Sequence, residues 1–359
     1  MMSRAVSFPS NSILIIAPWL QGGGAQGALV NLMTLLPKEQ ITMVVLFKGN
    51  RNHHAIRALV SSYTELDFPK SILGVWHASR ALKKYIEKNN TIYSLMRASH
   101  LVLGLISPRI LAQKRLAATF HQLPSQDSEG VKGKVENILV RRGVRGAGLI
   151  TAPSVRAIEE LNEQNIGSFE VNKVEQNLIS TSASHPKPPR DGVLTQPRLL
   201  FAGRLTEQKG LDRLGELLAE TKVHVHVRCL GDGKERKRLH ELSESISGHT
   251  IELFHHVEDI TEHLDWADAV FLPSRWELNP LVIWEGRARG RATVGSSIEA
   301  FKDLSKSGPM LLFSNAAEFA EIIQNISEQS DLRNKLFHQA LDSYKRVNTR
   351  SLIVQYLAG

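Results

Sequence analysis

The sequence predicts an α/β protein with two Rossmann-like, doubly wound domains that face each other across a cleft. Short apolar runs alternate with longer amphipathic stretches along the whole chain, a pattern that gives parallel sheets covered by helices on both faces. At 359 residues the chain is too long for one ordinary core. One segment, Ser180–Gln196, interrupts the alternation with a composition rich in Ser, Pro and Lys, which is typical of a linker.

The first half of the chain contains apolar runs that predict strands, separated by stretches with helical periodicity. The strands are expected at Ile13–Ala17, Ile41–Phe47, Thr91–Met96, Leu116–Phe120, Gly148–Ala152 and Lys173–Gln176. The helices are expected at Ala28–Leu36, Ser79–Lys88 and Val155–Asn162. The run Ser12–Leu20 is similar to the apolar part of a signal peptide. It continues into a glycine run without a small-residue cleavage pattern, so we interpret it as a buried strand.

After the linker the alternation starts again. Strands are expected at Arg198–Ala202, His224–Leu230, Thr250–Phe254, Ala269–Leu272 and Ala292–Gly295. Helices are expected at Leu211–Glu220, Lys234–Ser243 and Leu281–Arg289, and Leu332–Leu357 is mainly helical in pattern. We therefore expect an N-terminal domain over 1–180, a linker over 181–196, a C-terminal domain over 197–335, and a helical segment over 336–359 that packs back toward the N-terminal domain. Doubly wound domains bind ligands at the carboxyl ends of their strands.

The composition describes a globular protein that favours anionic partners. The hydrophobic fraction is 42% and the charged fraction 22%, which excludes disordered and fibrous classes. The net charge of +8 suits a nucleotide diphosphate, a phosphorylated acceptor, an anionic membrane surface or nucleic acid. Basic clusters lie at Lys132–Arg145 and Lys234–Arg238. They contain no aromatic residues, which argues against nucleic acid, and they are either solvated helix faces or surfaces for a membrane or an acceptor. The single cysteine, Cys229, fits a reducing cytoplasm, and we expect its thiol to be buried and inert.

The segment Pro273–Gly290 carries the strongest chemical signal. Asn279 and Pro280 are typical of the N-cap and the first position of a helix, so a helix is expected to begin in the loop after a strand. Its free N–H groups and positive dipole end favour an anion. Glu277 lies just before this helix and Glu285 inside it. Two carboxylates there would repel the anion unless each accepts hydroxyl donors such as those of sugar and ribose. The alternative interpretation is that one of the two acids caps the helix and the other is a surface residue of it, which is common when such acids occur alone.

This segment, PSRWELNPLVIWEGRARG, resembles the E-x7-E signature of the retaining glycosyltransferases of family 4, or glycosyl transferases group 1, which have the GT-B fold. The matching positions are Pro273, Ser274, Glu277, Pro280, Glu285, Ala288 and Gly290. The resemblance implies that Glu285 binds the nucleotide ribose and that Glu277 holds hydroxyls of the transferred sugar. It also places Asn279 and Leu281 in the donor site.

A second motif, LLFAGRLTEQKG, spans residues 199–210. An apolar strand runs into Gly203 and is followed by Arg204 and Lys209. Cations at the carboxyl end of a strand can clamp a diphosphate and stabilise the charge of a leaving group. Alone, the motif would describe a loop with two exposed cations. It matches the G-R-L…K-G motif of the same family, which implies that Gly203, Arg204 and Lys209 contact the donor diphosphate.

The glycine run of the first domain is the third candidate. Gly22, Gly23 and Gly24 follow the first predicted strand, where glycine permits close approach of the backbone to a ligand. The stretch GGGAQGALVNL resembles the opening of many family members, whose loop borders the donor phosphates and the acceptor. Gln26 and Gly27 depart from the acid and the arginine usual there.

His121 is the fourth candidate, at the end of a predicted strand. A lone histidine is more often structural, but this one matches the strand-terminal histidine of the family. The resemblance implies that it faces Glu277 across the cleft and orients or polarises the donor sugar. Elsewhere the chain departs from the family. Residues 295–299 read GSSIE where G-G-x-x-E is usual, and His255-His256 stand in a turn where glycine is common, so we expect them to be loop residues.

Together these motifs predict a retaining glycosyltransferase that moves a sugar from a nucleotide-diphosphate sugar to a glycan or a lipid-linked acceptor. We expect it in polysaccharide or glycolipid synthesis, in the cytoplasm or peripherally at the inner face of the membrane. The sequence contains no D-x-D and no zinc-spaced Cys/His set, so no metal and no cofactor besides the nucleotide sugar is expected. The alternatives are a nucleotide-sugar epimerase or phosphorylase on the same fold, and a catalytically silent paralogue that binds a nucleotide sugar or a glycan.

Overall fold

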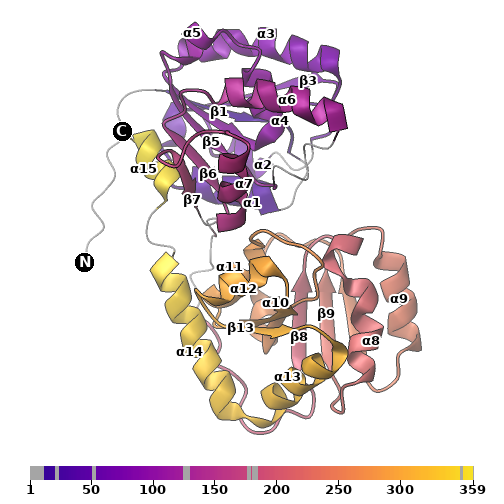
Figure 1. The fold of residues 1–359 in the computed structure, drawn as a ribbon. Coiled ribbons are helices and arrows are strands. Elements are labelled where there is room, and N and C mark those ends of the chain that lie inside the picture. The colour runs from indigo at the N-terminus through magenta and orange to yellow at the C-terminus, as the bar shows by residue number, and fades with distance from the viewer. Residues whose placement is uncertain are drawn as a thin grey trace. The chain divides into compact units, whose positions relative to one another are not determined.

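The computed structural model describes residues 12–20, 24–50, 54–123, 130–175, 179, 185–347 and 351–358. The chain divides into two compact units. Unit 1 consists of Met1–Leu178 and Arg350–Gly359, and unit 2 of Ile179–Thr349. Each unit holds one parallel sheet with helices around it (Figure 1). The predicted α/β class with two doubly wound sheets is therefore confirmed, whereas their facing across a cleft stays a prediction.

Unit 1 contains a seven-stranded parallel sheet in the order β3-β2-β1-β4-β5-β6-β7. Its strands are β1 (Ile13–Ala17), β2 (Ile41–Phe47), β3 (Ser62–Phe68), β4 (Thr91–Leu95), β5 (Arg115–Thr119), β6 (Leu149–Ala152) and β7 (Asn172–Val174). The order reverses beside β1, between β2 and β4. Ligands of doubly wound sheets bind at the carboxyl ends of the strands at such a reversal.

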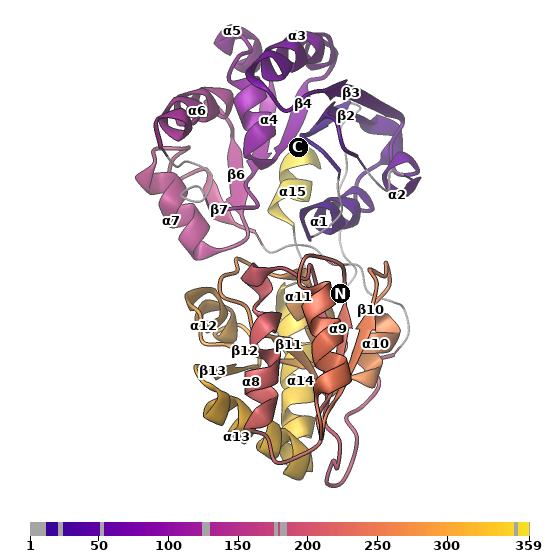
Figure 2. The same cartoon turned by 90° about the vertical axis from the view of Figure 1, so that its right-hand side faces the viewer.

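The helices of unit 1 cover both faces of this sheet. They are α1 (Gly24–Met33), η1 (Lys38–Gln40), α2 (His54–Arg57), α3 (Ile72–Lys88), α4 (Met96–Leu103), α5 (Pro108–Leu111), α6 (Gly130–Gly143), α7 (Val155–Glu163) and α15 (Leu352–Ala358). Helices α1, α2 and α15 share one apolar core with the inner side chains of the strands. Helices α3, α4 and α6 lie together in both views of the unit (Figures 1 and 2). Among the described residues, Met96 at the start of α4 packs against that core, whereas α3 and α6 contribute no side chain to it.

Strand β3 and the first turns of α3 have no counterpart in the sequence-based prediction. Strand β3 is an edge strand of mostly half-exposed polar residues, so no apolar run marks it, and it exists because it pairs with β2. Helix α3 begins at Ile72 instead of Ser79, because Ser71 caps it by accepting a hydrogen bond from the Gly74 N–H at 3.1 Å.

Unit 2 contains a six-stranded parallel sheet in the order β10-β9-β8-β11-β12-β13. Its strands are β8 (Arg198–Ala202), β9 (His226–Leu230), β10 (Thr250–Phe254), β11 (Ala269–Leu272), β12 (Ala292–Ser296) and β13 (Met310–Phe313). Its helices are η2 (Glu207–Lys209), η3 (Leu211–Arg213), α8 (Leu214–Ala219), α9 (Arg236–Ser245), α10 (Thr261–Trp266), α11 (Leu281–Ala288), α12 (Glu299–Ser305), α13 (Ala316–Glu328) and α14 (Ser330–Val347). The strand order reverses at β8, between β9 and β11. Cys229 of β9 is buried, and burial raises its pKa to about 12, so the thiol is protonated.

The C-terminal helices belong to different units. The domain boundary expected at residue 336 falls inside α14, which is part of unit 2. Helix α15 packs in unit 1, where Glu175 accepts hydrogen bonds from Ser351 Oγ at 2.5 Å and from the Ile353 N–H at 3.0 Å. Arg115 holds the other end of α15 by donating to the Tyr356 carbonyl at 2.5 Å.

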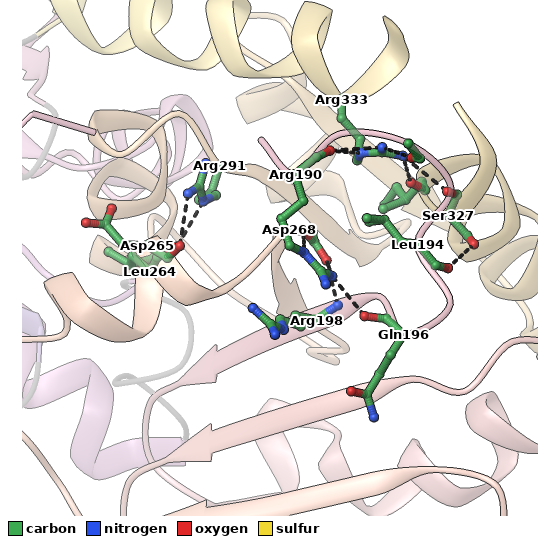
Figure 3. Close-up of polar contacts among 12 residues, drawn as sticks. Arg190, Leu194, Gln196, Arg198, Leu264, Asp265, Asp268, Arg291, Ser327 and Arg333 are labelled. Atoms are coloured by element: carbon green, nitrogen blue, oxygen red, sulfur yellow. Dashed lines mark hydrogen bonds and ion pairs between the residues drawn. The ribbon is translucent and has the colours of Figure 1, made fainter. Parts of the chain in front are cut away.

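The expected linker is bound along unit 2 rather than free (Figure 3). Its described part, residues 185–196, has no helix or strand. Arg190 donates to both carboxylate oxygens of Asp268, at 2.5 and 3.0 Å, and Asp268 also accepts from the Arg198 N–H at 2.7 Å. Arg333 donates to the carbonyls of Arg190 and Gly192. The free-energy cost of burying these charged groups is offset by the hydrogen bonds between them and to the carbonyls.

The pair between Arg190 and Asp268 gives a stability prediction. The Asp268 side chain is 3% exposed and accepts three hydrogen bonds, so Asp268→Asn leaves the guanidinium of Arg190 with no carboxylate to pair with. We expect the free energy of unfolding, measured with urea, to fall by about 2–4 kcal/mol. Asp303→Asn is the matched control, because the Lys306–Asp303 pair is exposed and should be worth under about 1 kcal/mol. Equal effects of the two substitutions would contradict this role of Asp268.

Candidate functional site

The candidate site of unit 2 lies at the carboxyl ends of β8 and β11, where the strand order of the sheet reverses. The loop after β8 contains Gly203, Arg204 and Lys209, and the loop after β11 contains Glu277 and leads into α11. Because β8 and β11 are paired neighbours in the sheet, the two sequence motifs come together although about 70 residues separate them along the chain. The structure thus brings together the residues that the two motifs contribute.

Gly210 permits a close approach of the two loops. It adopts the left-handed conformation, with φ 69°, and a Cβ atom there would lie 1.9 Å from the Pro273 carbonyl oxygen. Any other residue would be strained and would push the loops apart. Arg213 then donates to the same Pro273 carbonyl and, at 3.1 Å, to Ser296 Oγ of β12. Arg213, on η3, therefore connects the loop after β11 with the end of β12.

Arg275 forms a second connection between the loops. Its guanidinium makes two hydrogen bonds of 2.7 Å to the carboxylate of Asp212 and a third of 2.7 Å to the Glu207 carbonyl. The bonds from Arg275 hold the pKa of Asp212 below its usual range. The side chain of Gln208 donates to the Trp276 carbonyl at 3.1 Å. Sequence analysis did not identify these connecting residues, because their pairing is visible only when the two loops lie side by side.

Lys209 and Glu277 meet between these connections. The Lys209 ammonium forms an ion pair with Glu277, and Ser274 Oγ donates to the same carboxylate at 3.0 Å. The side chains of Lys209 and Glu277 are only 14% and 6% exposed, so the pair is shielded from water. Arg204 is exposed, and within the part of the chain that the structure describes it has no ion pair or side-chain hydrogen bond. This edge thus offers the exposed cation Arg204 in addition to a lysine–carboxylate pair.

Helix α11 begins one residue later than the capping pattern predicts. Its first residue is Leu281, and Pro280 occupies the N-cap position without a side-chain cap. The expected capping role of Asn279 is therefore wrong. The Asn279 amide oxygen instead accepts a hydrogen bond of 2.5 Å from Trp284 Nε1, because the buried indole needs an acceptor. Asn279 is itself buried and shapes the loop between Glu277 and the helix.

Glu285 lies four residues after Leu281 and therefore on the same face of α11. Both residues are half-buried. Burial, and to a lesser degree the charge of Asp259, raises the pKa of Glu285 to about 7. At neutral pH the carboxyl group is therefore partly protonated and partly ionised. Shifted pKa values of this kind are common at functional sites.

The turns after β9 and β10 complete this edge of unit 2. Gly231 has φ 141°, and a Cβ atom there would lie 2.0 Å from the Gly203 carbonyl oxygen, so the turns after β8 and β9 are in direct contact. Asp232 accepts hydrogen bonds from His255 Nδ1 at 2.7 Å and from the His256 N–H at 3.1 Å. Both histidines lie in a loop, as expected. Sequence analysis did not single out Gly231 or Asp232, because a lone G-D-G carries little information.

In unit 1, His121 follows β5 and borders a cavity of about 30 Å³. The cavity is lined by Ala28, Leu29, Leu32, Tyr93, Leu95, Thr119, His121, Thr151, Pro153, Glu175 and Ile353. Burial lowers the pKa of His121 to about 4, so the ring is neutral at pH 7. Its buried Nε2 has no hydrogen-bond partner within the described structure. A neutral imidazole with a free ring nitrogen can donate to or accept from a sugar hydroxyl.

The glycine run is only partly visible. Gly24 is exposed and is the first residue of α1, whereas Gly22 and Gly23 lie outside the described residues. Because His121 belongs to unit 1 and Glu277 to unit 2, their facing across a cleft stays a prediction.

Known proteins are similar to part of this chain in sequence and to nearly all of it in fold. Residues 196–329 match the model of the family "Glycosyl transferases group 1". The lipopolysaccharide core biosynthesis glycosyltransferase LpsE of Rhizobium meliloti is 30% identical over 145 residues, which are 39% of this chain and 42% of that protein. This chain thus matches less than half the length of that relative.

Solved structures are similar over nearly the whole chain. Anabaena Alr3699/HepE in complex with UDP-glucose has a TM-score of 0.77 at 18% identity and covers 97% of this chain and 98% of its own. The lipopolysaccharide outer core galactosyltransferase WaaB, in its apo form, has a TM-score of 0.67 at 16% identity, with 94% and 98% covered. At such identities the likeness shows the fold. The chain has the GT-B fold, and its residues 196–329 match the glycosyl transferases group 1.

Proposed function

We propose that this protein transfers a sugar from a nucleotide-diphosphate sugar to a glycan or a lipid-linked acceptor, with retention of the anomeric configuration and without a metal. One observation supports this most: Arg204, Lys209 and Glu277 lie on two interlocked loops at the same sheet edge as Glu285. Cations suit a diphosphate, and carboxylates suit the hydroxyls of the ribose and the sugar. A nucleotide sugar presents both chemistries in one molecule.

The proposed roles follow from these positions. Arg204 and Lys209 bind the diphosphate and stabilise its charge as the bond from the anomeric carbon to the phosphate oxygen breaks. Glu277, fixed by Lys209 and Ser274, holds hydroxyls of the transferred sugar. Glu285 accepts the ribose hydroxyls, while Leu281, Asn279 and the Gly203 turn line the donor. In unit 1, His121 orients the sugar, and Gly22, Gly23 and Gly24 are assigned to the donor.

The known proteins indicate which donor and acceptor to test first. HepE of Anabaena has been solved in complex with UDP-glucose, so a uridine diphosphate sugar is the first candidate donor. LpsE and WaaB are named for lipopolysaccharide core synthesis, which supports a lipid-linked or lipopolysaccharide acceptor. With such an acceptor, the enzyme works in the cytoplasm, peripherally at the inner face of a membrane.

A panel of nucleotide sugars tests the function. We expect one donor to raise the melting temperature of the protein and to release its nucleotide slowly in water, because transfer to water is the basal reaction of a transferase. Glu285→Ala should abolish the thermal shift, which depends on ligand concentration over Kd. Donor binding without nucleotide release from any sugar would instead indicate a silent binding module. Undiminished nucleotide affinity in Glu285→Ala would overturn the role of Glu285.

Donor affinity should depend on pH through Glu285. Ribose hydroxyls prefer the carboxylate, so affinity rises with pH until the group with pKa about 7 is ionised. We expect UDP-glucose to bind about tenfold more weakly at pH 6 than at pH 8, measured by calorimetry. The phosphates of this donor do not titrate in that range. Glu285→Gln should bind weakly with a flat pH profile, which separates Glu285 from the nearby histidines. A flat profile in the wild type would contradict the assignment.

Lys209 and Glu277 should act as a unit in catalysis. Lys209→Met removes the diphosphate cation and leaves Glu277 unpaired, so we expect kcat to fall by about 10²–10³-fold. Glu277→Gln alone should cost a similar factor, whereas the double variant should lose much less than the product of the two. Lys306→Met, at an exposed pair, serves as the control and should leave kcat unchanged. Strictly multiplicative losses would show that the two side chains act independently.

A further inference from the structure

Helices α3 and α6 flank α4 on one side of unit 1. Close contact through glycine fixes how α6 packs: a Cβ atom at Gly104 would lie 2.1 Å from the Leu139 carbonyl oxygen, and one at Gly143 would lie 2.0 Å from the His100 carbonyl oxygen. The face of α6 with Val140 and Gly143 is therefore turned to α4, and the opposite face to the solvent. Helix α4 is mostly buried between its two neighbours.

The solvent face of α6 combines exposed apolar and basic side chains. Val135 and Ile138 are 56% and 62% exposed. Cations surround them, and Glu136, which is half-buried, is the only acid between residues 134 and 145. The exposed cations are Lys134, Arg141, Arg142 and Arg145.

Helix α3 repeats this combination. Its first turns expose Ile72 to 84%, Leu73 to 71% and Trp76 to 45%. The side chain of Arg80 lies over the Trp76 ring at 4.7 Å, and Glu87 is the only acid between residues 70 and 88. The exposed cations of α3 are Arg80, Lys83, Lys84 and Lys88, and Lys70 lies just before the helix. Exposed side chains as large as these rarely cluster on a monomeric protein without a partner.

These two solvent faces together, Ile72–Lys88 and Lys134–Arg145, form what we term the α3–α6 surface. A purely acidic partner would pair with its cations but would leave Ile72, Leu73 and Ile138 in water. A bilayer with anionic lipids satisfies both, because its headgroups attract the cations and its acyl region accepts the apolar side chains. Over the described residues, no helix is long and apolar enough to cross a bilayer.

We propose that the α3–α6 surface docks unit 1 on an anionic membrane, with Ile72, Leu73, Trp76, Val135 and Ile138 inserted at the headgroup boundary and the surrounding cations on the lipid phosphates. The inference rests on the proposed function only for its biological setting, since a lipid-linked acceptor is presented at such a surface. The binding itself requires neither donor nor acceptor, and it engages no residue that we assign to the donor site.

Vesicle co-sedimentation of the full-length protein tests the proposal. We expect binding to phosphatidylcholine vesicles that contain phosphatidylglycerol, weak binding to pure phosphatidylcholine, and a loss of binding as salt rises. Arg141→Gln/Arg142→Gln/Arg145→Gln should weaken binding by about tenfold or more. The matched control is Lys234→Gln/Lys237→Gln/Arg238→Gln, which removes three exposed cations of unit 2 and should bind as the wild type does.

The apolar contribution is tested separately. Val135→Ser/Ile138→Ser keeps every charge and should also lose binding, whereas Val193→Ser, at a side chain of unit 2 that is 69% exposed, should not. Lipids with brominated acyl chains should quench the fluorescence of the wild type more than that of Trp76→Phe.

Nucleotide-dependent thermal shifts, unchanged in these variants, show that they are folded and keep a failure here distinct from a failure of the proposed function. Unaltered vesicle binding in both the cation and the apolar variants would overturn the proposal. So would binding only to an acidic protein and not to vesicles.

Discussion

The candidate site of unit 2 depends on the contact between the loop after β8 and the loop after β11. Gly210 brings the backbone against Pro273, and Arg213 binds the same carbonyl together with Ser296. Such a close approach would leave polar groups unpaired unless side chains bond to them. Arg213 bonds to the Pro273 carbonyl, and Arg275 pairs with Asp212 of η3. Because these loops are fixed to each other, Lys209 and Glu277 meet at one point.

The charges of the chain serve three purposes that net charge alone does not distinguish. Arg190 and Arg333 are structural, since they hold the segment 185–196 on unit 2 through carbonyls and Asp268. Lys209 is matched to a shielded carboxylate at the candidate site. The cations of α6 face the solvent around apolar side chains. Burial and partners, rather than the number of basic residues, decide what each group can bind.

The motifs predicted which residues meet at the candidate site better than they predicted its details. The two motifs placed Arg204, Lys209, Glu277 and Glu285 at one sheet edge, because parallel strands that are neighbours in a sheet end on the same side. The capping role predicted for Asn279 is wrong. Its amide oxygen accepts a hydrogen bond from the buried indole of Trp284, and this interaction outweighs the local capping preference. Local sequence also did not reveal that residues 185–196 of the expected linker are held in place by hydrogen bonds. Carbonyl groups of this segment accept from arginines that lie about 100 to 140 residues further along the chain.

By itself, the sequence determined the alternation of strands and helices, the two sheets, and the residue types of the candidate site, because these depend on periodicity and on motifs within short windows. Only the tertiary structure decided which charges are paired, that Glu285 has a pKa about 7, and that the solvent faces of α3 and α6 keep large apolar side chains exposed. The reason is physical: burial, pairing and exposure arise from groups that come together in space, and no local pattern encodes them.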